Sequence, residues 1–184
     1  KLKSTYFGIG DLNVSHNDKL LAYSLDLKGS EYYDIYLRKL SDKKDLKDLI
    51  KNTNGSILFS YDNTFIIYIK LDANHRSKEI FMHKIGTPQT LDKIIYSEKI
   101  DRFSVSIYPT SDEKYFIISS GDHSTNKCYI LDSKLKSLKL KLFKDYKENI
   151  TYSIDSWNGY FYNHTNENAI DFKIERVKHK AIKN

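Results

Sequence analysis

The chain has 184 residues, 40% of them hydrophobic, and a formal net charge of +6. This size and apolar content suit one folded domain and exclude a disordered tail. The single Cys excludes an internal disulfide and indicates a reducing compartment, so we expect a cytoplasmic protein. No apolar run approaches the roughly 18 residues of a membrane span, and no signal-peptide core follows Lys1–Ser4, so no membrane partner is expected.

The apolar residues are mainly types that fit strands. The chain holds 15 Tyr and 9 Phe but one Met and one Trp, and aromatic side chains suit pleated, half-buried surfaces. In chain order, a short apolar strand, a polar turn with Asp or Asn and a more apolar strand recur over residues 12–23, 57–69, 103–118 and 152–162. The turn markers Asp18, Asp62, Asp112 and Asn158 lie 44 to 50 residues apart, which is typical of four-stranded propeller blades.

Each repeat continues with further candidate strands. Third strands are expected at 33–40, 79–85, 127–131 and 169–177, and outer strands near 49–50, 94–96 and 138–143. The pattern predicts an all-β fold, a partial, open β-propeller of about four blades of four-stranded antiparallel sheet, with the last blade incomplete. The approximate blade ranges are 11–52, 56–101, 103–147 and 151–178. A sandwich or an open meander of the same hairpins is the alternative.

Neither end of the sequence completes a blade. Residues 1–10 fit the tail of an earlier blade, and Lys180–Asn184 supplies no outer strand for the last repeat. Because propellers close with four to eight blades, we expect a piece of a larger propeller whose first and last sheets expose apolar faces.

Several segments resemble one protein family, in the same order along the chain. The similar segments are Ala22–Asp26 with Gly29–Ile35, His83–Thr87, Asp92–Tyr96 with Glu98–Asp101, Asp122–Thr125 with Leu131–Asp132, and Phe161–Phe172. They resemble stretches of oligopeptidase B (protease II) and its prolyl oligopeptidase relatives, whereas Lys178–Asn184 matches nothing in that family. The resemblance implies a propeller that caps an α/β-hydrolase domain. There a Ser-Asp-His triad cleaves short peptides after Lys or Arg, and the propeller keeps folded proteins out.

The sequence holds none of that family's catalytic machinery. The nucleophile requires a Gly-x-Ser-x-Gly elbow, whereas Gly29-Ser30, Gly55-Ser56 and Gly86-Thr87 lack the second glycine and fit turns. We therefore expect no catalytic, cofactor-binding or metal residues, no α/β-hydrolase domain in this chain and no hydrolysis by the chain alone.

Other residues with reactive side chains fit structural roles better. The His residues, at positions 16, 75, 83, 123, 164 and 179, show no metal-ligand spacing. His83, which lies in a family-like segment, is expected to have a strand-packing or hydrogen-bonding role and not to be a metal ligand. Asp122-His123-Ser124 combines the residue types of a triad, but neighbours on one loop point apart, which favours a turn. Cys128 lies in an apolar strand, which favours a buried, inert thiol.

The positive charge is almost all Lys, spread along the chain, which favours solubility over base recognition. Lys134–Lys147 alternates Lys with Leu, which favours an outer edge strand protected from aggregation. A helix, or a face for nucleic acid or an anionic membrane, is the alternative. Because positive charge repels basic peptides, we expect the lysines on the outer rim and not on the innermost strands.

Three functions compete. The leading hypothesis is the non-catalytic, substrate-gating propeller segment of an oligopeptidase B-like serine peptidase, partnered by the α/β-hydrolase domain and facing short basic peptides. The alternative is a free-standing propeller fragment that binds a partner or itself through its open edges. A nucleic-acid partner is not expected, because Arg clusters and recognition fingerprints are absent.

Overall fold

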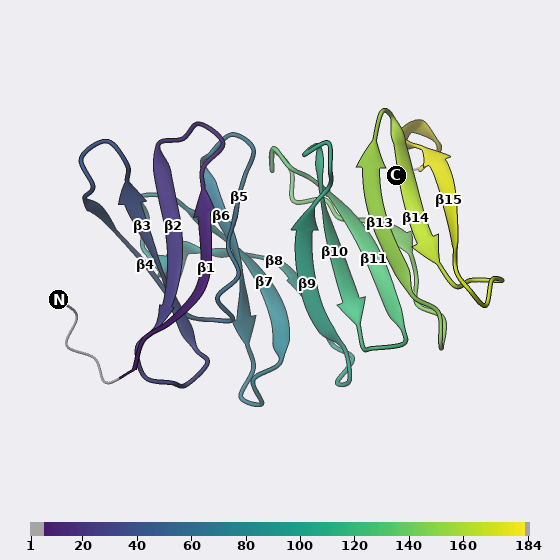
Figure 1. Ribbon diagram of the computed structural model, residues 1–184, viewed down its shortest axis with the longest axis horizontal. Coiled ribbons are helices and arrows are strands. Elements are labelled where there is room, and N and C mark those ends of the chain that lie inside the picture. Colours follow the sequence, from purple (N-terminus) through teal and green to yellow (C-terminus); the bar gives the residue numbers. More distant parts are fainter. Residues whose placement is uncertain (1–5, 183–184) are drawn as a thin grey trace. The chain divides into compact units, whose positions relative to one another are not determined.

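The computed structural model describes residues 6–182 as antiparallel strands joined by turns (Figure 1). The strands are β1 Gly8–Val14, β2 Leu20–Asp26, β3 Tyr33–Lys39, β4 Asp45–Thr53, β5 Leu58–Phe59, β6 Phe65–Leu71, β7 Ser77–Lys84, β8 Lys93–Ser97, β9 Ser104–Pro109, β10 Tyr115–Gly121, β11 Asn126–Asp132, β12 Lys141–Lys144, β13 Tyr152–Trp157, β14 Tyr160–Thr165 and β15 Lys173–Lys178. The only helical segments in this described part are two short 3-10 turns, η1 Gln89–Leu91 and η2 His179–Ala181. The predicted all-β fold is confirmed.

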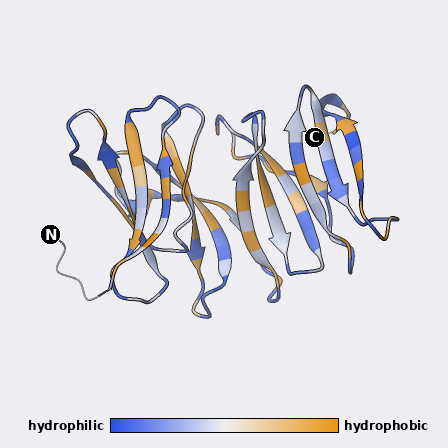
Figure 2. Ribbon diagram, in the orientation of Figure 1, coloured by the Kyte–Doolittle hydropathy of each residue, from blue (hydrophilic) through white to orange (hydrophobic). Residues whose placement is uncertain are grey.

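The chain divides into two compact units, an N-terminal unit of residues 1–97 and a C-terminal unit of residues 98–184. The N-terminal unit holds the first repeat, β1–β4, and the second, β5–β8; the C-terminal unit holds the third, β9–β12, and the fourth, β13–β15. In Figure 2 the hydrophobic colour gathers within the strands and the hydrophilic colour at the connecting turns. Each unit therefore buries the inner faces of its own two repeats.

In the N-terminal unit the two repeats share one sheet. The strand order is β1-β2-β3-β4-β6-β7-β8, with β5 on β6, because the end of β4 pairs with β6 at Thr53 and Lys70. This differs from the separate four-stranded sheets that the repeat predicts. The buried core comprises Ala22, Ile35, Leu37 and Ile50 from the first repeat and Ile57, Phe59, Ile66, Tyr68 and Phe81 from the second. The two repeats are thus joined both by backbone pairing and by apolar packing.

In the C-terminal unit the two repeats form separate sheets, β12-β11-β10-β9 and β13-β14-β15. Ile117, Cys128 and Ile130 of the third repeat pack on Tyr152, Ile154 and Phe161 of the fourth. A side chain joins the sheets where no strands pair. Asn126 donates from Nδ2 to the Tyr152 carbonyl at 2.8 Å and accepts the Tyr152 N–H at 2.7 Å. The Asn126 amide therefore acts as a short piece of neighbouring strand.

Three of the four hairpins share one turn. In each, a hydroxyl side chain donates to the carboxylate or amide oxygen two residues on and accepts the N–H five residues on; the hydroxyls are those of Ser15, Ser60 and Thr110. The residues at the tips, Asp18, Asn63 and Glu113, have φ between 55° and 60°. These bonds set the register of each hairpin from within the turn.

The fourth hairpin is built differently. Ser156 and Trp157 belong to β13, so the turn consists of Asn158 and Gly159 alone. Both have positive φ, 46° and 83°, which a two-residue hairpin turn of type I′ requires and which Asn-Gly adopts readily.

Several predicted strand boundaries are wrong. Gly8–Gly10 begins β1 and is not the tail of an earlier blade. The first strand of the second repeat shrinks to Leu58–Phe59. The last third strand starts at Lys173, because the left-handed residues Asn168 and Phe172 hold a turn before it. Residues 1–5 and 183–184, which the predictions for both chain ends also include, lie outside the described residues.

Candidate functional site

The first strand of each repeat is free of basic residues. β1, β5, β9 and β13 contain no Lys, Arg or His, and their charged residues are Asp11 and Asp155. The basic side chains of the strands lie mostly on the third and fourth strands: Arg38, Lys39, Lys47, Lys51, Lys78, Lys84, Lys93, Lys127, Lys141, Lys144, Lys173, Arg176 and Lys178. None of the described lysines that belong to strands lies on the first strand of a repeat.

A buried histidine lies where the two repeats of the N-terminal unit meet. The side chain of His83 is fully buried, with Nδ1 2.7 Å from Asp92 Oδ1 and Nε2 3.1 Å from Asp48 Oδ1. The Asp48 and Asp92 side chains are 4% and 2% exposed. His83 has the predicted hydrogen-bonding role, and its partners are two carboxylates from other segments.

Further donors complete this buried cluster. Tyr68 donates its hydroxyl to Asp92 Oδ2 at 2.7 Å, and the Gly86 N–H donates to Asp48 Oδ1 at 2.5 Å. Burial raises the pKa of the Tyr68 hydroxyl far above its ordinary value, and the bond to Asp92 raises it further although Gln89 opposes it. Tyr68 therefore remains a donor. Because the side chains of His83, Asp48 and Asp92 are at most 4% exposed, the geometry of the cluster is that of a structural joint.

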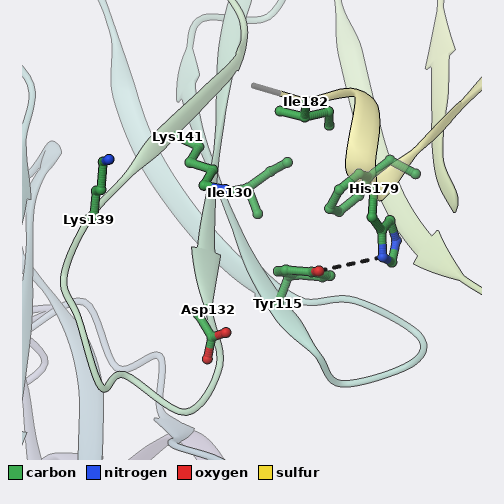
Figure 3. Close-up of a pocket in the computed structure, with 8 residues that line it drawn as sticks. Tyr115, Ile130, Asp132, Lys139, Lys141, His179 and Ile182 are labelled. Atoms are coloured by element: carbon green, nitrogen blue, oxygen red, sulfur yellow. Dashed lines mark hydrogen bonds between the residues drawn. The ribbon is translucent and has the colours of Figure 1, made fainter. Parts of the chain in front are cut away.

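The C-terminal unit brings a serine and a histidine together beside a pocket. Ser156 Oγ lies 2.9 Å from His179 Nε2, and Tyr115 Oη lies 3.4 Å from His179 Nδ1. The pocket, of about 200 Å³, is lined by Tyr115, Ile130, Asp132, Lys139, Lys141, Phe161, His179 and Ile182 (Figure 3). The pair has no local signal in the sequence, because 23 residues separate its members.

The hydrogen bonds of Ser156 exclude a nucleophile. Its hydroxyl also lies 3.0 Å from Asp112 Oδ2. Although burial alone raises the pKa of Asp112, bonds from Thr110 and Ser156 outweigh it and hold that pKa below its usual range, so the carboxylate accepts the hydroxyl proton. His179 Nε2 must then donate to Ser156, whereas a general base would have to accept from it. Ser156 is also fully buried.

The other catalytic-looking residues have structural roles. Asp122 Oδ1 accepts the N–H groups of Ser124 and Thr125, both at 3.0 Å, so Asp122-His123-Ser124 forms the predicted turn. Cys128 is fully buried, and burial raises its thiol pKa to about 12. That pKa leaves almost no thiolate near neutral pH, as the prediction of an inert thiol requires.

The lysine-rich segment is only partly a strand. Residues 134–140 are turn and irregular backbone, and β12 covers Lys141–Lys144. Leu135 is 5% exposed and has φ of 52°, which excludes the helix alternative. Within residues 6–182 no group of three or more His, Cys, Asp or Glu is placed to hold a metal ion. The helical turns in that range are too short for a membrane crossing.

Comparison with known proteins decides the family. The family model described as "Prolyl oligopeptidase, N-terminal beta-propeller domain" matches residues 2–184. The chain belongs to the prolyl oligopeptidase family. The match also confirms the predicted partial propeller, and the resemblance noted in the sequence is correct at the level of the family.

The chain spans only between 16% and 26% of the length of the relatives described here. Protease 2 of Moraxella lacunata is 24% identical across 93% of this chain and 25% of its own. Dipeptidyl aminopeptidase BI of Pseudoxanthomonas mexicana is 32% identical across 62% of this chain and 16% of its own length. Among solved structures, oligopeptidase B of Leishmania major has a TM-score of 0.92 and 22% identity over 97% of this chain and 26% of that one. Oligopeptidase B of Trypanosoma brucei with covalently bound antipain has a TM-score of 0.89 and 26% identity, and the match covers 98% of this chain and 26% of that one.

This chain of the prolyl oligopeptidase family thus corresponds to the propeller portion of larger peptidases. Its relatives combine that portion with a catalytic domain, and the share of their length that it covers is consistent with a part of one propeller.

Proposed function

We propose that this chain is the non-catalytic, substrate-gating propeller segment of an oligopeptidase B-like serine peptidase that cleaves short peptides after Lys or Arg. The catalytic α/β-hydrolase domain is its partner. We also propose a cytoplasmic location, which the lone, buried Cys128 supports.

The observation that carries the gating role is the distribution of charge. In a propeller the strands of each blade are arranged around a central channel, and the first strands of all four repeats carry Asp11 and Asp155 but no basic residue. We propose that the first strand of each repeat faces this channel in the whole propeller, where acidic side chains would attract a basic peptide and lysines would repel it. The 26% identity to the oligopeptidase B structure of Trypanosoma brucei supports an oligopeptidase B-like peptidase as the parent protein.

The first test is hydrolysis by the purified chain. We expect no turnover of an Arg or Lys ester, because catalysis needs the nucleophile elbow that the sequence lacks. Turnover that persisted through a second purification would contradict the proposal.

The second test places charge in the passage. The segment replaces its counterpart in Trypanosoma brucei oligopeptidase B, and kcat/KM is measured for a short Arg peptide. Ser106→Lys, at an exposed position of β9, should lower kcat/KM severalfold at low salt and less at high salt, because screening weakens the repulsion. Leu142→Lys, at an exposed position of β12, adds the same charge elsewhere and should have little effect. Equal effects of the two variants would refute a gating role for the first strands.

A second function, self-association, is supported by exposed apolar side chains on β1. Ile9, Leu12 and Val14 are 54%, 59% and 47% exposed, and such a patch often marks an interaction surface. Sedimentation at increasing concentration tests it. A dimer that Leu12→Lys dissociates would favour a free-standing module, and a strict monomer would eliminate it.

A further inference from the structure

A short connection between β7 and β8 covers the edge of β4. This segment, Gly86–Asp92, is called the strap here. Gln89 accepts the Lys51 N–H at 3.1 Å and donates to the Lys51 carbonyl at 3.1 Å. Because β3 pairs with the other edge of β4, the Gln89 amide satisfies backbone groups that would otherwise offer an open strand edge. The strap therefore joins the second repeat to the outer strand of the first.

The strap is fastened at both ends to the buried His83 cluster. At its start, the Gly86 N–H donates to Asp48 on β4, and Gly86 has φ of +88°, a conformation that favours glycine. At its end, Asp92 accepts from His83 and from the hydroxyl of Tyr68. These polar contacts therefore hold both ends of the strap, in addition to the bonds between Gln89 and Lys51.

The hydrogen bonds of His83 fix where protons must lie. A carboxylate oxygen only accepts, and each ring nitrogen of His83 faces one. A neutral imidazole has a single N–H, so its second nitrogen would direct a lone pair at a carboxylate. We infer that His83 is held as a doubly protonated imidazolium between Asp48 and Asp92, and that this ion triad fastens the strap to β4.

The charges around the triad support this assignment. The titratable groups that face His83 are Asp48 from β4, Asp92 from the strap and, through Asp92, the hydroxyl of Tyr68 on β6. With an imidazolium the triad carries one net negative charge and both carboxylates have a cationic donor. With a neutral ring, two negative charges would be buried without a counter-ion, which is strongly unfavourable away from water.

The first test counts ring protons in the unmodified 184-residue chain. Nitrogen-15 NMR at neutral pH should show two N–H groups on His83, one for each ring nitrogen, both protected from exchange by burial. A single N–H would place the extra proton on a carboxyl group or remove it, and would overturn the inference. This measurement needs no substitution, so a variant that fails to fold does not affect it.

The second test asks whether the triad fastens the strap. Asp92→Asn removes one anion but keeps the shape of the side chain. Hydrogen exchange of the Lys51 amide should then accelerate by about tenfold or more, because a hydrogen bond to a charged group is lost. Asp42→Asn, an exposed carboxylate of the same unit, is the matched control and should leave the rate unchanged. Equal Lys51 exchange in both folded variants would overturn the role of the triad in the strap.

Discussion

Each unit places a histidine between its two repeats, but the hydrogen-bond partners of the two histidines differ. In the N-terminal unit both nitrogens of His83 face carboxylates. In the C-terminal unit both nitrogens of His179 face hydroxyls, those of Tyr115 and Ser156. A hydroxyl rotates to donate or to accept, so one ring proton is sufficient for His179, whereas a carboxylate can only accept. A buried joint made with carboxylates therefore depends on charge, and one made with hydroxyls does not.

The other contacts between repeats also differ between the two units. Asn126 links the repeats of the C-terminal unit through two neutral hydrogen bonds to the backbone of Tyr152. The N-terminal unit has a continuous sheet through Thr53 and Lys70, with the ion triad at a separate point on β4. Removing one group should therefore cost more in the N-terminal unit.

The largest effect is expected for His83→Ala. This change leaves two buried carboxylates facing each other without a cation, so unfolding should become easier by about 3–5 kcal/mol. His179→Ala, the matched change in the other unit, should cost only about 1–2 kcal/mol, since it removes neutral hydrogen bonds and ring contacts. Urea denaturation measures both. Equal losses would mean that charge does not distinguish the two joints.

A smaller effect is expected for Asn126→Ala. It deprives the buried backbone of Tyr152 of its donor and acceptor, which should cost about 1–3 kcal/mol. Hydrogen exchange should locate the change in β11 and β13 and leave β2 and β3 as protected as before. Faster exchange throughout both units would contradict a local clamp.

The third prediction concerns acid. Burial alone raises the pKa of Asp26, but hydrogen bonds from the N–H groups of Lys28, Glu31 and Gly29 outweigh it and hold the pKa below its usual range. Because the pKa of Asp26 is lower in the folded than in the unfolded protein, Asp26 stabilises the fold fully at pH values above its unfolded-state pKa of about 4. This contribution disappears as the pH falls through the folded-state pKa. Asp26→Asn should therefore make the free energy of unfolding depend less steeply on pH in the acid range. Asp132→Asn, an exposed carboxylate of the C-terminal unit, should leave it unchanged.

The smallest perturbation is to label Cys128. With a thiol pKa of about 12 and no exposed surface, it should react with a thiol reagent only when the C-terminal unit opens. Asn126→Ala should accelerate labelling and His83→Ala should not, if the two units open separately. Rapid labelling of the folded wild type would contradict the burial of this side chain.

Features formed by residues close together in the sequence were predictable, whereas contacts between residues far apart in the sequence were not. The hairpin markers Asp18, Asp62 and Asp112 identify turns because the residues that make each turn lie within five positions of one another. The family was recognisable from segments such as His83–Thr87, which also drew attention to His83. Its partners were not predictable, because Asp48 lies 35 residues away on a strand whose register shifts twice against β3.

Strand ends failed for a related reason. Lys134–Leu140 alternates Lys and Leu as a strand would. Leu135, however, has a left-handed backbone conformation and is only 5% exposed, and strand pairing starts at Lys141. Hydropathy does not report backbone dihedral angles in residues other than glycine. The same limit applies to Phe172, whose φ of 65° delays the start of β15.

The shared hydroxyl turn of the first three hairpins has a consequence for the order of folding. Every bond that closes it spans at most five residues, so each hairpin can close as soon as its own residues have left the ribosome, before the neighbouring repeat exists. Asp48 and His83, by contrast, can meet only after the second repeat has been synthesised. Synthesis would then produce preformed hairpins in sequence, with the charged joint formed last in the N-terminal unit.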